Sequence, residues 1–194
     1  MLDPRHADAW FTLGRAAARQ TAWDEAISAY ERVVALEPAN SKALNNLANV
    51  YFRQGRFDLA ERWYARAIEV DPSYLLAVFH HGWVLRQLNR NEQAERAFRH
   101  CLELRPADPA AQRTHVDCLF LLGSLRFRAE DYAQAAALLE QVVTVLPTHT
   151  EARHLLGLAY RHLDRPADAE RELATHKEML RARRSEPIQI GDDP

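Results

Sequence analysis

Prolines recur along this chain of 194 residues at a fixed interval. Pro4, Pro38, Pro72 and Pro106 are separated from one another by 34 residues. Other residues keep the same interval, namely Ala26, Ala60 and Ala94, and Tyr30, Tyr64 and Phe98. A repeat of this length indicates a stack of similar supersecondary units, each of which buries its apolar face against its neighbours.

The interval is broken once. The next proline in phase is Pro147, 41 residues after Pro106, and the spacing from Gly123 to Gly157 is again 34. Seven residues are therefore inserted between the third and the fourth unit. The spacing predicts three units within residues 7–108 and two within 116–183, with the insertion at residues 109–115.

Each unit contains two stretches with helical apolar spacing, which are separated by a short polar break and closed by proline. A small residue in the first stretch and an alanine in the second would let two helix axes approach to about 8–10 Å. The small residues of the first stretch are Gly14, Ala48, Gly82, Gly123 and Gly157. The sequence therefore predicts an all-α fold built from helix–turn–helix units.

The insertion has two possible positions. Asp108 as N-cap and Pro109 as the first helical residue could begin one long helix that reaches about Ala129. Alternatively, a normal first helix ends near Gly123 and the second helix is longer. The first version is favoured, because Glu130–Tyr132 matches the turn and the second-helix start of the other units. In either case we expect disturbed stacking, so that the chain behaves as three repeats plus two.

The two ends of the repeat region differ from its middle. Residues 1–6 resemble the end of a further repeat, so we expect the chain to be cut from a longer array, with Trp10 and Trp23 exposed at an open N-terminal face that could mediate a homodimer. The last helix continues as a polar capping helix, and we expect residues 184–194 to be a disordered tail.

Composition excludes several classes of protein. A mean hydropathy of -0.41 and the absence of a long apolar run argue against a membrane span. A net charge of -2 provides no basic field for nucleic acid or for an anionic membrane. No charged segment followed by an apolar core opens the chain, so we expect a cytoplasmic protein.

The sequence contains no recognisable catalytic or metal-binding motif. None of the nine histidines has metal-ligand spacing, and no nucleophile motif, phosphate-binding loop or paired carboxylates occur. We therefore expect no catalytic residue, no metal and no cofactor, and a protein that is not an enzyme. His81 stands where other units have leucine, which predicts a partly buried, hydrogen-bonded histidine.

The pattern of tryptophan, leucine–glycine, tyrosine, alanine, phenylalanine and proline resembles the tetratricopeptide repeat (TPR) family. Residues 41–72, "SKALNNLANVYFRQGRFDLAERWYARAIEVDP", are close to its consensus. The resemblance covers residues 7–183 and implies an α-solenoid, a right-handed superhelix with the first helix of each repeat on its concave side. It identifies the fold but not the partner.

The resemblance also places certain repeat positions on the concave groove. In this chain they include the following residues: Phe11, Arg15, Arg19, Asn45, Asn46, Asn49, Phe52, Arg53, Phe79, His80, Trp83, Arg86, Phe120, Phe127 and Arg128. Asn46 matches the asparagine with which family members hold a ligand backbone. Arginines can bind carboxylates, asparagines can pair with an extended backbone and aromatic rings can form apolar pockets.

These residues predict a non-catalytic scaffold that binds an extended, acidic and aromatic-containing protein or peptide segment. The carboxylate clamp of chaperone receptors is not supported, because Phe11, Arg15, Leu76 and His80 stand where that clamp has other residues. Two alternatives remain: the substrate-recruiting arm of a larger enzyme such as a glycosyltransferase, and a self-associating structural module. Nucleic-acid binding is the weakest interpretation.

Overall fold

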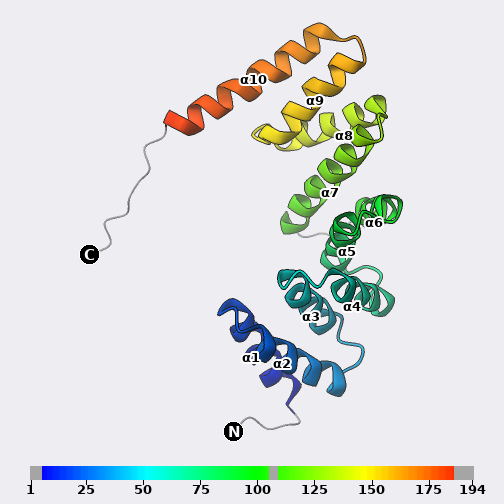
Figure 1. Cartoon of the computed structure of the whole chain (residues 1–194), viewed down its shortest axis with the longest axis vertical. Coiled ribbons are helices and arrows are strands. Elements are labelled where there is room, and N and C mark those ends of the chain that lie inside the picture. The colour runs from blue at the N-terminus through cyan, green and yellow to red at the C-terminus, as the bar shows by residue number, and fades with distance from the viewer. Residues whose placement is uncertain (1–5, 105–108, 186–194) are drawn as a thin grey trace, which may run out of the picture. The chain divides into compact units, whose positions relative to one another are not determined.

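The computed structural model describes residues 6–104 and 109–185, which form ten α-helices and no strand (Figure 1). The helices are α1 (Ala7–Arg19), α2 (Trp23–Leu36), α3 (Ser41–Arg53), α4 (Phe57–Val70), α5 (Leu75–Gln87), α6 (Asn91–Glu103), α7 (Pro109–Arg128), α8 (Tyr132–Val145), α9 (Thr150–His162) and α10 (Pro166–Ser185). They form sequential antiparallel pairs, so the predicted all-α class of helix–turn–helix repeats is confirmed.

The turn inside each repeat has one recurring geometry. One residue in each of the five turns adopts a positive φ of 54–73°, and the next backbone N–H bonds to the carbonyl five residues earlier, as in Arg56 N to Tyr51 O at 2.9 Å. This is the Schellman ending of a helix. Only Gly55 is a glycine; the other four positions hold Thr21, Asn89, Glu130 and Asp164.

The repeats are also separated by a recurring feature. Pro38, Pro72 and Pro147 each follow the end of a second helix by two residues, where proline cannot continue the helix. In two of these linkers a side chain then caps the next helix: Asn40 Oδ1 accepts from Ala43 N at 2.9 Å, and His149 Nδ1 accepts from Ala152 N at 3.2 Å.

The inserted residues lie in α7. This helix has 20 residues, whereas α1, α3, α5 and α9 have 13 each. It begins at Pro109 and ends at Arg128, which is the placement that the sequence favoured. Asp108, the expected N-cap, lies outside the described residues.

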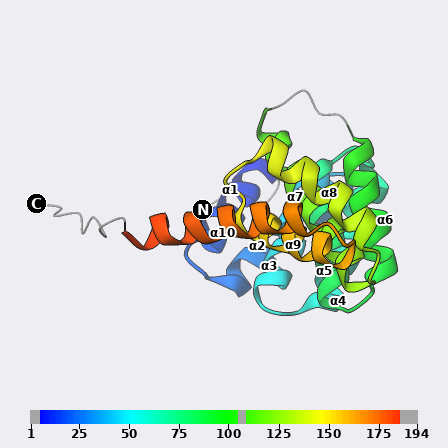
Figure 2. The same cartoon turned by 90° about the horizontal axis from the view of Figure 1, so that it is seen from above.

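The chain divides into two compact units between Thr114 and His115, within α7. In the first unit α1 contacts α3 and α3 contacts α5, so the first helices of three repeats lie next to one another. In the second unit α8 packs on α9 and α9 on α10, and α10 extends beyond α9 (Figures 1 and 2). The repeat boundaries assigned from the period remain a prediction.

The small residues permit close helix crossing, as the period predicted. A Cβ built on Gly82 would lie 2.7 Å from Cε1 of Phe98, and one on Gly14 would lie 2.8 Å from Cε1 of Tyr30. Both rings are buried, together with Ala26 and Ala94 of the second helices. The aromatic ring of the second helix therefore occupies the space beside the first helix that a side chain would need.

Replacing Gly82 with alanine is expected to lower the free energy of unfolding by about 1–3 kcal/mol, because the added methyl group overpacks a full site. Urea denaturation measures the change. The same substitution in a Phe98→Leu background should cost less, since a leucine, Leu139, already faces Gly123 with its nearest atom at 3.0 Å from the built Cβ. An equal cost in both backgrounds would contradict this steric explanation.

The N-terminal face is less open than expected. Trp10 is half-buried, its indole nitrogen is buried without a hydrogen-bond partner among the described residues, and the Arg32 guanidinium lies 6.0 Å from the ring centre. Trp23 is also half-buried. A homodimer through this face remains a prediction. The upstream remnant and the tail fall largely outside the described residues.

Candidate functional site

A cavity of about 560 Å³ lies between α1, the start of α2, and α3. Its lining includes five residues that the sequence placed in the groove: Arg15, Arg19, Asn46, Asn49 and Arg53. The helical period explains the grouping, because Arg15 and Arg19 lie one turn apart on α1, and Asn46, Asn49 and Arg53 are spaced by three and four residues on α3. We call this space the arginine cavity.

The arginine cavity is positively charged. Its lining contains Arg15, Arg19 and Arg53 and no carboxylate, and none of the three arginines forms an ion pair with another described residue. Elsewhere in the chain arginines do find carboxylates, as in Arg153 with Glu172 at 2.6 Å. Three exposed guanidinium groups in one concave site attract an anionic ligand and offer forked hydrogen bonds to carboxylates.

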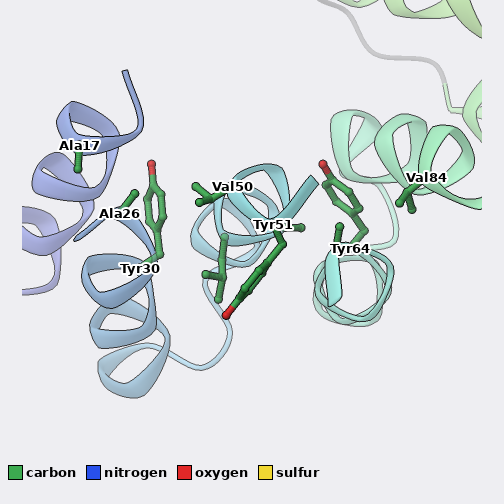
Figure 3. Packing of buried hydrophobic residues seen from close by; sticks show 10 residues of the cluster. Ala17, Ala26, Tyr30, Val50, Tyr51, Tyr64 and Val84 are labelled. Atoms are coloured by element: carbon green, nitrogen blue, oxygen red, sulfur yellow. The ribbon is translucent and has the colours of Figure 1, made fainter. Parts of the chain in front are cut away.

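Two tyrosine hydroxyls lie beneath the asparagines. Figure 3 shows the side chains of Tyr30 and Tyr64 pointing the same way, while that of Tyr51 points the opposite way. The Tyr64 hydroxyl donates to Asn49 Oδ1 at 2.5 Å. Since that oxygen accepts from tyrosine, the amide hydrogens of Asn49 remain available to a ligand carbonyl.

Burial controls the ionisation of these tyrosines. It raises the pKa of Tyr64 well above its usual value, against the opposing effect of Arg53. It also raises the pKa of Tyr30, where Arg15 and a hydrogen bond with Asn46 act in the opposite direction. Both phenols therefore stay neutral, and the arginines alone supply the charge of the cavity.

An aromatic cluster continues the same face from α3 to α5. The Phe52 and Trp83 ring centres are 4.9 Å apart, and Phe57 lies 5.3 Å from Phe52. Phe52 and Trp83 are only half-buried. Tilted aromatic rings in contact, such as these, form an apolar platform on which another ring or an aliphatic side chain can pack.

His80 is a half-buried histidine beside this cluster. Its Nδ1 lies 3.3 Å from Asn45 Oδ1, and Asn45 Nδ2 donates to Asn46 Oδ1 at 3.5 Å. Since Asn45 Oδ1 is an acceptor, Nδ1 of His80 carries the proton and Nε2 remains an acceptor. Burial lowers the pKa of His80 to about 4.

This shift predicts a pH dependence of stability. Because the pKa of His80 is about 4 in the folded chain and near 6.5 when unfolded, the unfolded state binds the additional proton between these values. The free energy of unfolding should therefore fall as the pH drops from about 6.5 to about 4. Urea denaturation at several pH values measures the slope, which His80→Gln should reduce; an unchanged slope in that variant would contradict the assignment.

The structure places the other predicted groove residues in several settings. Asn45 is buried, with 2% of its surface exposed, so it supports His80 and Asn46 rather than facing a ligand. The Phe11 ring packs edge-on against Tyr30 at 5.8 Å, and the Phe79 ring lies 5.4 Å from that of His80. Arg86 is half-buried on α5.

Three predicted groove residues belong to the second unit. Phe120 packs on His149, with ring centres 4.6 Å apart. Phe127 packs edge-on against Tyr132 at 5.3 Å, and Arg128 is exposed. These contacts build a separate aromatic surface within that unit, and the arginine cavity is formed by the first unit alone.

Sequence reasoning missed half of the cavity lining. Trp23 and Tyr30 complete it, together with Ala18, Thr21 and Val50. Tyr30 was recognised only as a packing residue of the period. The missed signal is its hydroxyl, which Tyr64 of the second repeat shares and which Phe98 and Leu139 of the third and fourth repeats lack.

Other expectations concern chemistry and membranes. His81 is half-buried and lies 3.3 Å from Glu61 through Nε2, so the expected hydrogen-bonded histidine is confirmed. The described residues contain no group of three histidine, cysteine or acidic side chains that could hold a metal. Among the described helices, none is both long and apolar enough to cross a bilayer.

Comparison with known proteins supports the repeat assignment. Family models described as the tetratricopeptide repeat match residues 2–34, 11–74, 77–108 and 126–182. No curated protein matches the chain.

Several solved structures share the fold. A crystal structure of MamA protein has a TM-score of 0.79 at 18% identity, covering 97% of this chain and 98% of that one. MamA from Desulfovibrio magneticus RS-1 gives 0.80 at 17% identity, covering 95% and 99%. YrrB, described as a TPR protein with an unusual peptide-binding site, has a TM-score of 0.75 at 16% identity, covering 93% of each chain.

At these identities the likeness shows the fold alone, and helical repeats of this fold generally present a binding surface along their stacked helices. The family models cover most of the chain, and its helix pairs, turns and small-residue contacts repeat in the same phase. The chain belongs to the tetratricopeptide repeat family, whose members form protein-interaction modules.

Proposed function

We propose that this chain is a non-catalytic scaffold that binds an extended, acidic and aromatic-containing segment of a partner protein along α1, α3 and α5. The observation that carries the proposal is the arginine cavity, where Arg15, Arg19 and Arg53 lie together without a carboxylate. Arginines that serve only to keep a protein soluble are expected to be scattered over its surface. Three of them in one concave site, beside asparagines and aromatic rings, instead favour a binding role.

Three kinds of groove residue would contact different parts of the bound segment. The arginines bind carboxylates of the segment, and the amides of Asn46 and Asn49 pair with its backbone N–H and C=O groups. The half-buried Phe52 and Trp83 receive an aromatic or aliphatic side chain. Adjacent packed helices lie about 8–10 Å apart, so an extended segment would place its acidic and apolar residues about three positions apart.

The YrrB likeness is consistent with this proposal, since YrrB is described as a TPR protein with an unusual peptide-binding site. A repeat protein binds an extended segment with modest affinity, because the segment loses conformational entropy on binding. Specificity then depends on a few anchoring residues rather than on the whole contact area.

Selection of random peptides displayed on phage tests the proposal. The purified chain should enrich peptides that combine acidic and aromatic residues, and the Asn46→Ala/Arg53→Ala/Trp83→Ala variant should not. A variant with the same number of substitutions at exposed positions of the second helices, Arg62→Ala/Arg99→Ala/Gln141→Ala, is the matched control and should retain the consensus. No enrichment of this acidic and aromatic consensus, or the same consensus surviving the groove substitutions, would refute the groove as the site.

A further inference from the structure

A second cavity, of about 510 Å³, lies on the other side of the first unit. It is bounded by α4 and α6, the second helices of two successive repeats, and α5 forms its floor. None of its lining residues belongs to the arginine cavity. We call it the outer cavity.

The internal repeat explains why the outer cavity is empty. Ala97 lines it, and the residue 34 positions earlier is Trp63. Trp63 packs against the buried clusters that contain Val34, Leu44 and Tyr51. The residues 34 positions after these three are Ile68, Val78 and Leu85, and all three line the outer cavity.

The outer cavity is thus lined by residues equivalent to those around Trp63, and Ala97 stands at the position that the tryptophan occupies in the preceding repeat. Its floor keeps the apolar Val78 and Leu85 beside His81, whose Nε2 already pairs with Glu61 at 3.3 Å, which disfavours ordered water as the natural filling. Leu85 in place of Tyr51 and Gln93 in place of Leu59 enlarge the space further.

The second unit offers a comparison within the same chain. The position equivalent to Ala97 in the last repeat is Glu172 on α10, which is buried and accepts a hydrogen bond from Arg153 Nη1 at 2.6 Å. There a buried ion pair occupies the place that Trp63 fills in the second repeat. Beside Ala97 neither an indole ring nor an ion pair of the described residues fills the equivalent space, and a cavity lies there.

The charges around the outer cavity indicate what a guest must carry. Glu69 lies on the α4 wall and Arg96 on the α6 wall, and neither forms an ion pair with another described residue. His100 lies where the preceding repeat has Arg66, whose guanidinium is 5.7 Å from the Trp63 ring centre. Glu69, Arg96 and His100 therefore suit a guest segment that carries an aromatic side chain, with a basic residue beside it that faces Glu69 and an acidic residue that faces Arg96.

We propose that the outer cavity is a second binding site, which receives a tryptophan side chain, flanked by one basic and one acidic residue, from a partner protein. The site is distinct from the groove, because the two are lined by different residues. The chain would then hold two protein segments at once, one on the first helices of its repeats and one on the second helices.

N-acetyl-L-tryptophanamide is the probe that tests this site, and the methyl resonances of Ile68, Val78 and Leu85 report its binding to the full chain by NMR. We expect saturable shifts of these methyl groups with a dissociation constant on the order of millimolar, as is usual for a ligand of this size. N-acetyl-L-alaninamide should shift them at least about tenfold less at equal concentration. Arg53→Ala, which disables the groove, should leave the titration unchanged.

Substituting Ala97 with a larger side chain that fills the cavity is the decisive control. Ala97→Trp should abolish the methyl shifts and raise the melting temperature by about 2–5 °C, because the new indole enters a preformed space. Ala97→Leu should weaken the binding of the probe and should raise the melting temperature by less than Ala97→Trp does. Absence of methyl shifts in the wild type, shifts that persist in both variants, or a lower melting temperature in both variants would each overturn the proposal.

Discussion

Replacing Arg15 and Arg53 with glutamate is expected to weaken binding of an acidic groove peptide by about 100-fold or more. Each arginine is exposed in the arginine cavity and lacks an intramolecular ion pair among the described residues, so its guanidinium is available to a ligand carboxylate. A hydrogen bond to a charged group contributes about 1.5–3 kcal/mol, and charge reversal adds repulsion to this loss. Fluorescence anisotropy with a peptide from the display selection measures the change.

The matched control changes the net charge by the same amount elsewhere. Arg62 on α4 and Arg181 on α10 are exposed and lie outside the groove. Arg62→Glu/Arg181→Glu should change the affinity less than about threefold. Added salt should weaken the wild type more than the groove variant, because salt screens exposed charge pairs. Equal losses in both variants would show that only the overall charge matters.

Replacing Glu172 with leucine is expected to lower the free energy of unfolding by about 3 kcal/mol. The Glu172 carboxylate accepts from Arg153 Nη1 at 2.6 Å, and the two side chains are 9% and 15% exposed. Arg153 also donates from Nε to Pro147 O at 2.8 Å, which holds it in place when its partner is lost. Removing one member therefore leaves a charge in a largely dry site. Urea denaturation of the full chain gives the loss.

The second substitution should restore most of this stability. In Arg153→Met/Glu172→Leu two apolar side chains of similar size replace the ion pair, and such replacements are often neutral or stabilising. We expect the double variant to lie within about 1 kcal/mol of the wild type. A double variant that is as unstable as Glu172→Leu would show that the loss comes from packing rather than from the unpaired charge.

The period of 34 residues predicted most of the fold, because the prolines, small residues and aromatic rings that keep it each have a packing role. Gly82, for example, was expected at a close helix crossing, and a Cβ built on it would lie 2.7 Å from Cε1 of Phe98. The turns were harder to foresee. Glu130 and Asp164 adopt a positive φ that glycine usually occupies, because the hydrogen bonds of the turn stabilise it against an intrinsic cost of about 1–2 kcal/mol.

The candidate site was predictable in part. The shared face of α1 and α3 followed from helical spacing, and Arg15, Asn49 and Arg53 line one cavity; their role in binding a ligand stays a prediction. The spacing of residues in a sequence does not show how deeply each one is buried. Asn45 was therefore predicted to contact a ligand, whereas it is buried and its side chain lies beside His80. The outer cavity was also missed, because it depends on a side chain that is absent at Ala97 rather than on one that is present.

The location of a bound groove peptide tests the account most directly. A peptide from the display selection should be titrated into the isotope-labelled full chain and followed by NMR. The account predicts that the largest shifts fall on the side chains of Asn46, Asn49, Arg53 and Trp83, on α3 and α5. Shifts confined to α2, α4 and α6, with these four side chains unaffected, would contradict it.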